Sequence, residues 1–150
     1  MAPYCPRMTA VPFSLHPQLA QDTTPVGDLP LTRVLLANDA GYPWLILVPR
    51  RAGAVEIIDL ADDDQLTLTR EIAQAARALK AVTACDKLNV AAIGNVVPQL
   101  HVHVVARRRD DDAWPKPMWG AAPAKPYEAA ARDALMTRLR KTFGAMLTQP

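Results

Sequence analysis

An alternation of polar and apolar residues in one short segment constrains the fold more than any other feature: Gln99-Leu100-His101-Val102-His103-Val104-Val105. A period of two is typical of a β-strand that is buried on one face. In such a strand the apolar side chains face a core, and Gln99, His101 and His103 form a row on the opposite face. Two of the three histidines of the chain are therefore predicted to stand side by side.

Further strands are predicted where β-branched and aliphatic residues cluster: residues 31–36, 44–48 and 87–93. The segment 38–41 (Asn-Asp-Ala-Gly) is a turn signal between the first two, which predicts an antiparallel hairpin. Residues 96–98 are expected to form a very short connection into the motif strand, so that the last two strands are also antiparallel. This hairpin is expected to bring Asn95 close to Gln99 and His101.

Two main helices are predicted from apolar residues that recur at helical spacing. The first runs from Asp62 to about Ala84, with Asp62 as a cap, Gln65 three residues later, and Glu71 away from the apolar stripe. The second is predicted over residues 127–145, where Gly144 is the stop signal. Between the motif strand and this helix, residues 110–126 are expected to form an ordered loop, since they contain two tryptophans and four prolines.

These elements predict a single α+β domain over residues 1–150, with an antiparallel sheet of about five strands and two main helices. Residues 1–30 contain six prolines and are expected to form an irregular arm. The third histidine, His16, lies in this arm and is expected to be a solvated loop residue.

Composition narrows the class of protein. A length of 150 residues with 50% hydrophobic residues is that of one globular domain. The net charge of +2 gives no reason to expect nucleic acid as a partner, and the basic run 107–109 is followed at once by the acidic run 110–112. No apolar run approaches the roughly 20 residues of a membrane span, and the N-terminus does not resemble a signal peptide. Cys5 and Cys85 lack metal-ligand spacing, so we expect reduced thiols and a cytoplasmic protein.

The histidine row has the chemistry of a phosphate site. An imidazole titrates near neutrality and acts as a nucleophile when a hydrogen bond fixes one nitrogen and the other is free. An anion above the row would meet His101, the side-chain amide of Gln99 and the ring N–H of His103. Ordinary surface histidines and a His-x-His metal site are the two alternatives, although zinc requires three or four ligands. Ser14 is the only serine, and no nucleophilic serine or cysteine motif is present.

Residues 99–105 resemble the histidine triad (HIT) motif, His-Φ-His-Φ-His-Φ-Φ, in which Φ is apolar. The likeness covers about residues 30–120, because the order of elements is also that of the HIT family: strand, turn with Asn38, strand ending in Val48-Pro49-Arg50, helix, strand, motif strand. Trp114-Pro115 resembles the Trp-Pro that follows the motif in the nucleoside phosphoramidase branch. The chain is similar to a bacterial HIT subgroup that carries Gln-Leu-His-Val-His.

The resemblance implies a homodimer that hydrolyses or transfers nucleotides without an organic cofactor, with a divalent metal only as a counter-ion of the substrate. By motif position, His101 is the expected nucleophile, which attacks the α-phosphate and forms a nucleotidyl-histidine intermediate. His103 is expected to bind phosphate oxygens. Asn38 is expected near the ribose, Asn95 near the phosphate and Trp114 at the substrate.

The sequence departs from the family pattern in two places. Gln99 stands where the first histidine belongs, and glutamine does not carry a proton through a reaction. The connection over residues 95–98 is shorter than the Gly- and Ser-rich loop of the family. Two hypotheses therefore follow: an enzyme acting on dinucleoside polyphosphates or nucleoside phosphoramidates, or a nucleotide-binding regulatory protein with little or no turnover.

Overall fold

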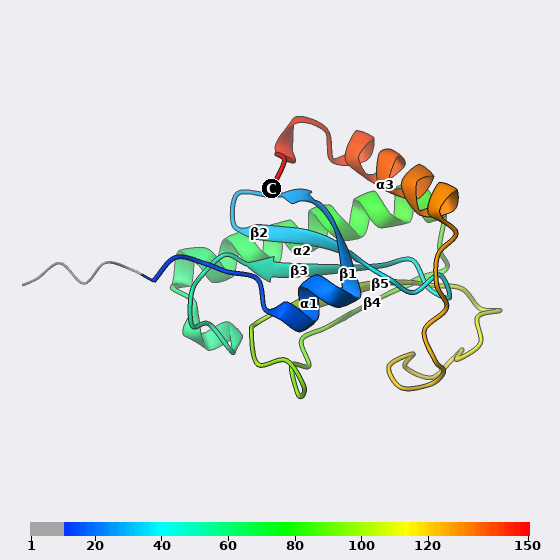
Figure 1. Ribbon diagram of the computed structural model, residues 1–150, viewed down its shortest axis with the longest axis horizontal. Coiled ribbons are helices and arrows are strands. Elements are labelled where there is room, and N and C mark those ends of the chain that lie inside the picture. Colours follow the sequence, from blue (N-terminus) through cyan, green and yellow to red (C-terminus); the bar gives the residue numbers. More distant parts are fainter. Residues whose placement is uncertain (1–10) are drawn as a thin grey trace, which may run out of the picture.

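A five-stranded antiparallel sheet forms the centre of the chain. The computed structural model describes residues 11–150 (Figure 1). The strands stand in the order β1-β2-β3-β5-β4, with these bounds: β1 (Thr23–Asp28), β2 (Thr32–Ala37), β3 (Trp44–Pro49), β4 (Lys87–Ala91) and β5 (Val102–Arg107). The predicted α+β class and antiparallel sheet are confirmed. Cys5, together with Pro3 and Pro6 of the predicted arm, lies outside the described residues.

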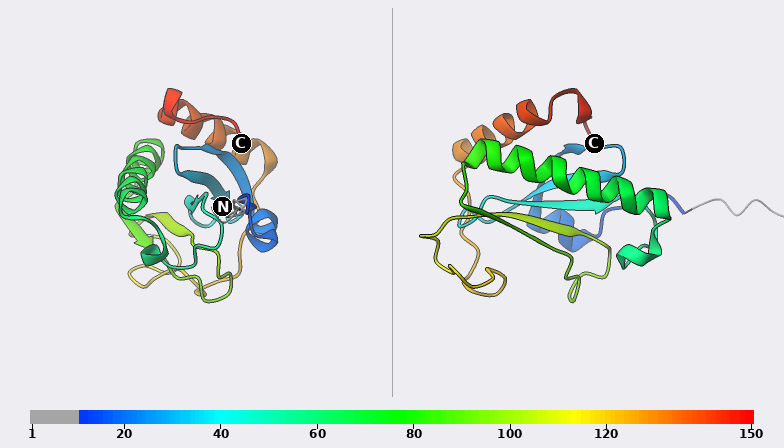
Figure 2. Two further views of the ribbon diagram at one scale, coloured as in Figure 1. Left: turned by 90° about the vertical axis from the view of Figure 1, so that its left-hand side faces the viewer. Right: turned by 180° about the vertical axis from the view of Figure 1, so that it is seen from behind.

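Helices cover both faces of the sheet. α2 (Asp62–Thr83) and α3 (Ala129–Phe143) lie on one face, and the short α1 (Pro17–Asp22) lies on the other (Figure 2). Two 3-10 turns, η1 (Ile57–Asp59) and η2 (Gly144–Met146), precede α2 and follow α3. None of the helices within residues 11–150 is both long and apolar enough to cross a membrane.

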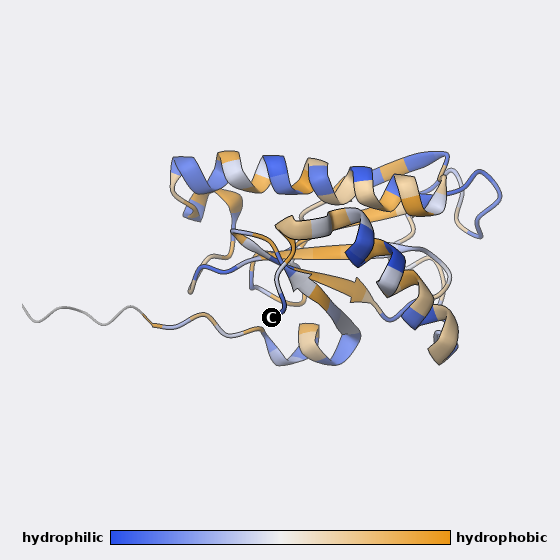
Figure 3. Cartoon of the chain, turned by 90° about the horizontal axis from the view of Figure 1, so that it is seen from above, coloured by the Kyte–Doolittle hydropathy of each residue, from blue (hydrophilic) through white to orange (hydrophobic). Residues whose placement is uncertain are grey.

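Alternation along the strands produces two cores, one on each face of the sheet. The larger core packs the apolar stripe of α2 and the buried residues of α3 against the sheet, and its central members are Val34, Leu36, Leu45, Leu47, Val104, Ala75, Leu79 and Leu139. On the opposite face, Leu35, Ile46 and Val48 pack against Leu19 of α1 and the partly buried Phe13. Figure 3 shows the apolar strands beneath α2, whose colours alternate between hydrophobic and hydrophilic. Both faces of β3 are therefore buried, as its continuous run of apolar residues requires.

The N-terminal arm is more regular than the prolines suggested. Residues 17–28 form α1 and β1, so the expectation of an irregular segment over residues 1–30 is wrong for this part. Pro17 occupies the first turn of α1, where no N–H is needed. Pro25 lies in β1 at the edge of the sheet, next to a register shift between Pro25 and Gly27. Prolines at these positions are compatible with regular structure.

The outer edge of β1 is covered by the C-terminal part of the chain. Asp28 and Thr148 exchange two backbone hydrogen bonds of 2.8 and 2.9 Å. The guanidinium group of Arg140 donates to the carbonyl oxygens of Val26 and Pro25. The opposite edge strand, β4, has no neighbour on its outer side within the described residues.

The start of α2 and the connection before β5 differ from the prediction. The N-cap of α2 is Ala61, and no side chain caps the helix; Gln65 instead donates to the carbonyl oxygen of Leu60. The predicted capping by Asp62 is therefore wrong. The connection between β4 and β5 comprises residues 92–101, because β5 begins only at Val102, and it is longer than expected.

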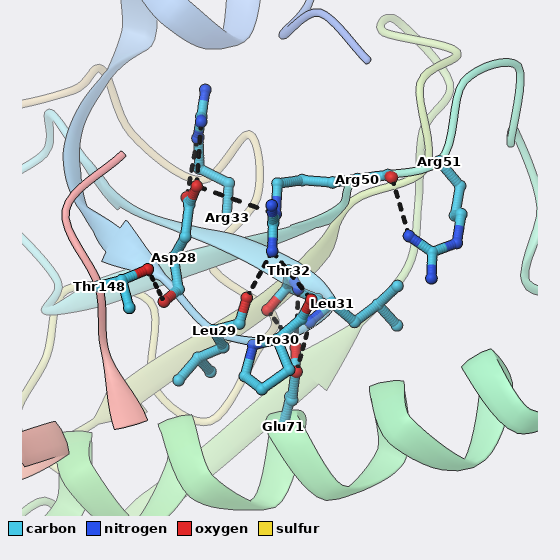
Figure 4. A network of polar contacts seen from close by, with 10 residues as sticks. All are labelled: Asp28, Leu29, Pro30, Leu31, Thr32, Arg33, Arg50, Arg51, Glu71 and Thr148. Carbon is cyan, nitrogen blue, oxygen red and sulfur yellow. Dashed lines mark hydrogen bonds and ion pairs between the residues drawn. The ribbon is translucent and has the colours of Figure 1, made fainter. Parts of the chain in front are cut away.

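A polar network ties the β1–β2 turn to α2 and to the end of β3 (Figure 4). Glu71 of α2 is only 3% exposed and accepts hydrogen bonds from the amides of Leu31 and Thr32 (both 2.8 Å) and from the Thr32 hydroxyl (2.6 Å). Arg50 donates to the carbonyl oxygen of Leu29, and Arg33 pairs with Asp28 at 2.9 Å. Glu71 is thus buried, and both of its carboxylate oxygens accept hydrogen bonds, although its position off the apolar stripe suggested exposure.

A buried arginine fastens the loop over residues 110–126 to the sheet. Arg107, the last residue of β5, is 1% exposed and donates two hydrogen bonds to Asp111, one to Asn89 of β4 and one to the carbonyl oxygen of Lys116. Every polar atom of its guanidinium group is paired, as a buried charge requires. The first residue of the predicted basic run is therefore a structural anchor.

Candidate active site

A cavity of about 660 Å³ lies on the face of the sheet opposite α2. Its floor is the side chains of Ile46 and His103, which are paired in register between β3 and β5. α1 and the β2–β3 turn form one wall, and the 92–101 connection forms another. Trp119, from the loop after β5, completes the lining. Most of the lining is apolar, which is typical of sites for small organic ligands.

The ring of His101 is held in one orientation by the backbone two residues before it. It precedes β5, is buried, and its Nδ1 lies 2.7 Å from the carbonyl oxygen of Gln99. A carbonyl oxygen only accepts, so Nδ1 carries the proton. In the neutral imidazole the lone pair is therefore on Nε2. This is the arrangement that a nucleophilic histidine needs.

His103 is enclosed by three rings and bonded to one of them. Trp44 of β3 donates from Nε1 to Nδ1 of His103 at 3.0 Å. The ring centroids of Trp44, Trp119 and His101 lie 5.4, 5.5 and 4.9 Å from that of His103. Burial, and to a lesser degree the neighbouring His101, lowers the pKa of His103 to about 4. His103 is therefore neutral at physiological pH.

The charged side chains that line the cavity are acidic. Asp22 and Asp39 lie at its wall, and the described part of the chain contributes no lysine or arginine to the lining. Asp39 accepts hydrogen bonds through Oδ1 from the amides of Gly41 (2.8 Å) and Lys125 (3.1 Å). Within residues 11–150, no group of three or more histidine, cysteine, aspartate or glutamate side chains is arranged to hold a metal ion.

The structure brings four of the six predicted site residues to the cavity: His101, His103, Asn38 and Asn95. Gln99 is not among the lining residues. Its side chain instead accepts from the amide of His16 and donates to the carbonyl oxygen of Ser14, both at 2.9 Å. His16 is not a free loop residue, because its ring caps α1 by accepting from the amide of Gln18. The predicted row of Gln99, His101 and His103 thus does not include Gln99, because β5 begins only at Val102 and the alternation of a strand does not extend to residue 99.

Of the two tryptophans in the 110–126 loop, the cavity receives the second. Trp114, the predicted substrate residue, lies over the guanidinium group of Arg107 at 5.6 Å and does not line the cavity. Trp119 lines it and contacts His103. Sequence reasoning also missed Trp44 and Asp39. The position of Trp44, two residues before Ile46 in a predicted strand, was the available signal, because residues two apart share a face.

Comparisons with known proteins identify the family of the chain. The HIT domain family model matches residues 18–110, which is more than half of the chain. A histidine triad protein from Bradyrhizobium japonicum is 51% identical, with a TM-score of 0.88 over 89% of this chain and 100% of that chain. One from Sinorhizobium meliloti is 42% identical, with a TM-score of 0.85 over 87% and 96% of the two chains. One from Marinobacter aquaeolei is 41% identical, with a TM-score of 0.86 over 89% and 97%.

A comparison with curated proteins gives no match. The family model and the three solved structures nevertheless agree with each other and with the predicted family. The chain belongs to the histidine triad (HIT) family.

Proposed function

We propose that the protein binds a nucleotide in this cavity and acts as a nucleotidyl hydrolase or transferase, with His101 as the nucleophile. One observation carries the proposal: the 2.7 Å contact between Nδ1 of His101 and the carbonyl oxygen of Gln99 leaves Nε2 as the unprotonated nitrogen at the cavity. Membership of the HIT family supports nucleotide as the ligand class.

The proposed reaction has two steps. The lone pair on Nε2 of His101 attacks the α-phosphorus, a nitrogen–phosphorus bond forms, and the bond to the leaving group breaks. The leaving group departs with the electron pair of that bond and is protonated from solvent, because the Gln99 side chain is held by His16 and Ser14. Water then attacks phosphorus and gives a proton to solvent, and the nitrogen–phosphorus bond breaks with its electron pair returning to Nε2. This step releases the nucleoside monophosphate and restores His101. The reaction requires no organic cofactor.

The other lining residues have supporting roles in the proposal. His103 donates to phosphate oxygens, and Asn95 lies at the same cavity for a second phosphate contact. In the proposal Asn38 contacts the ribose, although its Oδ1 already accepts from the hydroxyl of Thr24 at 2.9 Å. Dinucleoside polyphosphates and nucleoside phosphoramidates remain the two proposed substrate classes.

Intact-protein mass spectrometry after brief mixing with an adenosine phosphoramidate tests the proposal. The expected result is an adenylyl adduct on the native protein and none on His101→Ala. His16→Asn is the matched control, because it removes a histidine outside the cavity while asparagine retains the capping function at α1. An adduct that persists in His101→Ala contradicts the role of His101.

The second candidate is a nucleotide-binding regulatory protein with little or no turnover. The observation in its favour is the position of Gln99, which leaves the cavity without a proton donor from that residue. Calorimetry with AMP and with an adenosine phosphoramidate separates the two candidates. Binding of the phosphoramidate without AMP release favours the regulatory protein, and AMP release at rates that His101→Ala lacks favours the enzyme.

We further propose that the chain is a cytoplasmic homodimer that forms through β4. This strand lies at the uncovered edge of the sheet, and its Val90 is 48% exposed. An exposed strand edge offers unpaired backbone groups to a second copy. Nucleic acid is not among the proposed partners, because the net charge of the chain is only +2.

A further inference from the structure

We infer that Trp44 is a positioning residue that keeps His103 neutral and in a single tautomer, with its only proton on Nε2. His103 then meets a bound ligand as a hydrogen-bond donor and never as an acceptor. The phosphate contact that this donor makes rests on the proposed function, whereas the state of the ring in the free protein does not.

The hydrogen bond from Trp44 decides which nitrogen of His103 carries the proton. An indole N–H only donates, and it lies 3.0 Å from Nδ1 of His103. Nδ1 must therefore offer its lone pair, and the proton of the neutral ring is on Nε2. Protonation of Nδ1 would place two N–H groups opposite each other and would break this bond.

The other nitrogen of His103 is accessible. Nε2 has no hydrogen-bond partner among residues 11–150. In the same residues, the buried side-chain atoms without a partner are Tyr42 Oη, Arg50 Nε and Trp119 Nε1, so Nε2 of His103 is not a buried orphan. Because the residue lines the cavity, this N–H is the donor that a ligand meets.

Among residues 11–150, the register partners and ring contacts of His103 include no acidic side chain. Its register partners are Ile46 on β3 and Ala91 on β4, and Trp119 packs on it from the loop. The titratable group that acts on it is His101, whose positive form would repel a second charge. Within the described residues, neither of the cavity carboxylates, Asp22 and Asp39, forms a hydrogen bond or ion pair with His103.

Two indoles flank His103, but only one of them bonds to it. Trp44 and Trp119 have ring centroids at 5.4 and 5.5 Å from the imidazole, so both pack against it at a similar distance. The indole nitrogen of Trp119 has no partner in the described part of the chain. Replacement of each tryptophan by phenylalanine therefore gives a matched pair that differs in the Nδ1 hydrogen bond.

Nitrogen-15 NMR of histidine-labelled, ligand-free protein tests the inference. In the native protein, His103 is expected to show the Nε2–H tautomer and to resist protonation down to about pH 4. In Trp44→Phe, a fraction of the Nδ1–H tautomer is expected. The titration midpoint should rise by about one pH unit above that of Trp119→Phe, because a hydrogen bond donated to Nδ1 favours the neutral ring. Equal tautomers and equal midpoints in the two variants would overturn the role of Trp44.

Two further measurements keep the test decisive. If Trp44→Phe does not fold, a through-hydrogen-bond coupling between Trp44 Nε1 and His103 Nδ1 in native protein supports the inference, and an Nδ1–H tautomer there overturns it. Addition of AMP is expected to shift the Nε2–H resonance of His103. If AMP leaves all histidine resonances unchanged while the tautomer is as expected, the nucleotide function fails and the inference about Trp44 stands.

Discussion

His101 and His103 are neighbours in sequence and space, but their rings are fixed by opposite kinds of partner. His101 donates from Nδ1 to a carbonyl oxygen, and His103 accepts at Nδ1 from an indole. The first therefore keeps a lone pair on Nε2, and the second keeps a proton there. Although both residues are histidines, the first imidazole is thus suited to act as a nucleophile and the second to donate a hydrogen bond.

Stability is expected to fall as pH decreases from 6.5 to 4, in part because of His103. Burial lowers the pKa of His103 to about 4 in the folded protein, whereas the ordinary value is 6.5, so the unfolded chain binds more protons in this window. The free energy of unfolding therefore rises with pH across it. His103→Gln should lose a contribution on the order of 3 kcal/mol from this dependence. Urea unfolding at pH 7 and pH 4 measures it, and identical pH dependence of the two proteins would contradict the assignment.

The two loop tryptophans are expected to differ in their effect on ligand binding. Trp119 lines the cavity, so Trp119→Leu should weaken AMP binding about tenfold, which corresponds to about 1.4 kcal/mol. Trp114 covers Arg107 outside the cavity, so Trp114→Leu should lower the melting temperature and change the Kd for AMP much less. Calorimetry and thermal unfolding of both variants provide the comparison. The reverse order of Kd values would restore Trp114 as the substrate residue.

At the level of elements, α2 does more than cover the sheet. Its apolar stripe packs on the strands, and Glu71 reaches the backbone where β2 begins. Buried backbone amides require partners, and a carboxylate supplies two strong acceptor atoms. The helix thereby fixes the position of the β1–β2 turn as well as the core.

Glu71→Gln is expected to destabilise the fold by about 1.5–3 kcal/mol, the range for hydrogen bonds to charged groups. The glutamine amide places a donor opposite one of the backbone N–H groups that Glu71 now satisfies. Arg70→Gln is the matched control, because Arg70 is exposed on the same helix and should change stability by less than about 0.5 kcal/mol. Chemical unfolding measures both, and a Glu71→Gln variant as stable as the control would show that these bonds are dispensable.

The periodicity of apolar residues predicted most strands and the two long helices. It did not predict features that depend on residues far away in the sequence. β2, β3 and the two long helices follow from repeated apolar spacing in the sequence. β1 was missed because Pro25 is tolerated only at a sheet edge, and the sequence does not reveal which strand is the edge. Gln99 was placed in the histidine row because alternation continues through it, yet its side chain is held by Ser14 and His16, more than 80 positions away.

The whole molecule presents two unlike sheet edges. β4 exposes its outer backbone groups within the described residues, and Val90 lies there on the side of the sheet that α2 covers, in register with Val104. β1 is occupied along its outer side by Thr148 and Arg140. Pairing between copies is therefore available at β4 and obstructed at β1.

Val90→Lys is expected to convert the proposed dimer to a monomer. A lysine on an edge strand opposes pairing with a second strand, and two copies across a two-fold axis would bring like charges together. Ile58→Lys is the control, because Ile58 is an exposed aliphatic residue in η1, outside β4. Sedimentation equilibrium gives the mass of each variant. A monomeric native protein, or a dimeric Val90→Lys, would contradict assembly through β4.

The covered edge of β1 also limits how large an assembly can become. A sheet with two open edges adds copies head to tail and grows into a filament, whereas a sheet with one open edge closes after a single symmetric contact. We therefore expect the hydrogen bonds between Asp28 and Thr148 to prevent a further copy from pairing with β1. We expect removal of the last few residues to spare the residues that line the cavity and to expose the outer edge of β1. Aggregation, and not loss of ligand binding, is therefore the failure to look for in a truncated chain.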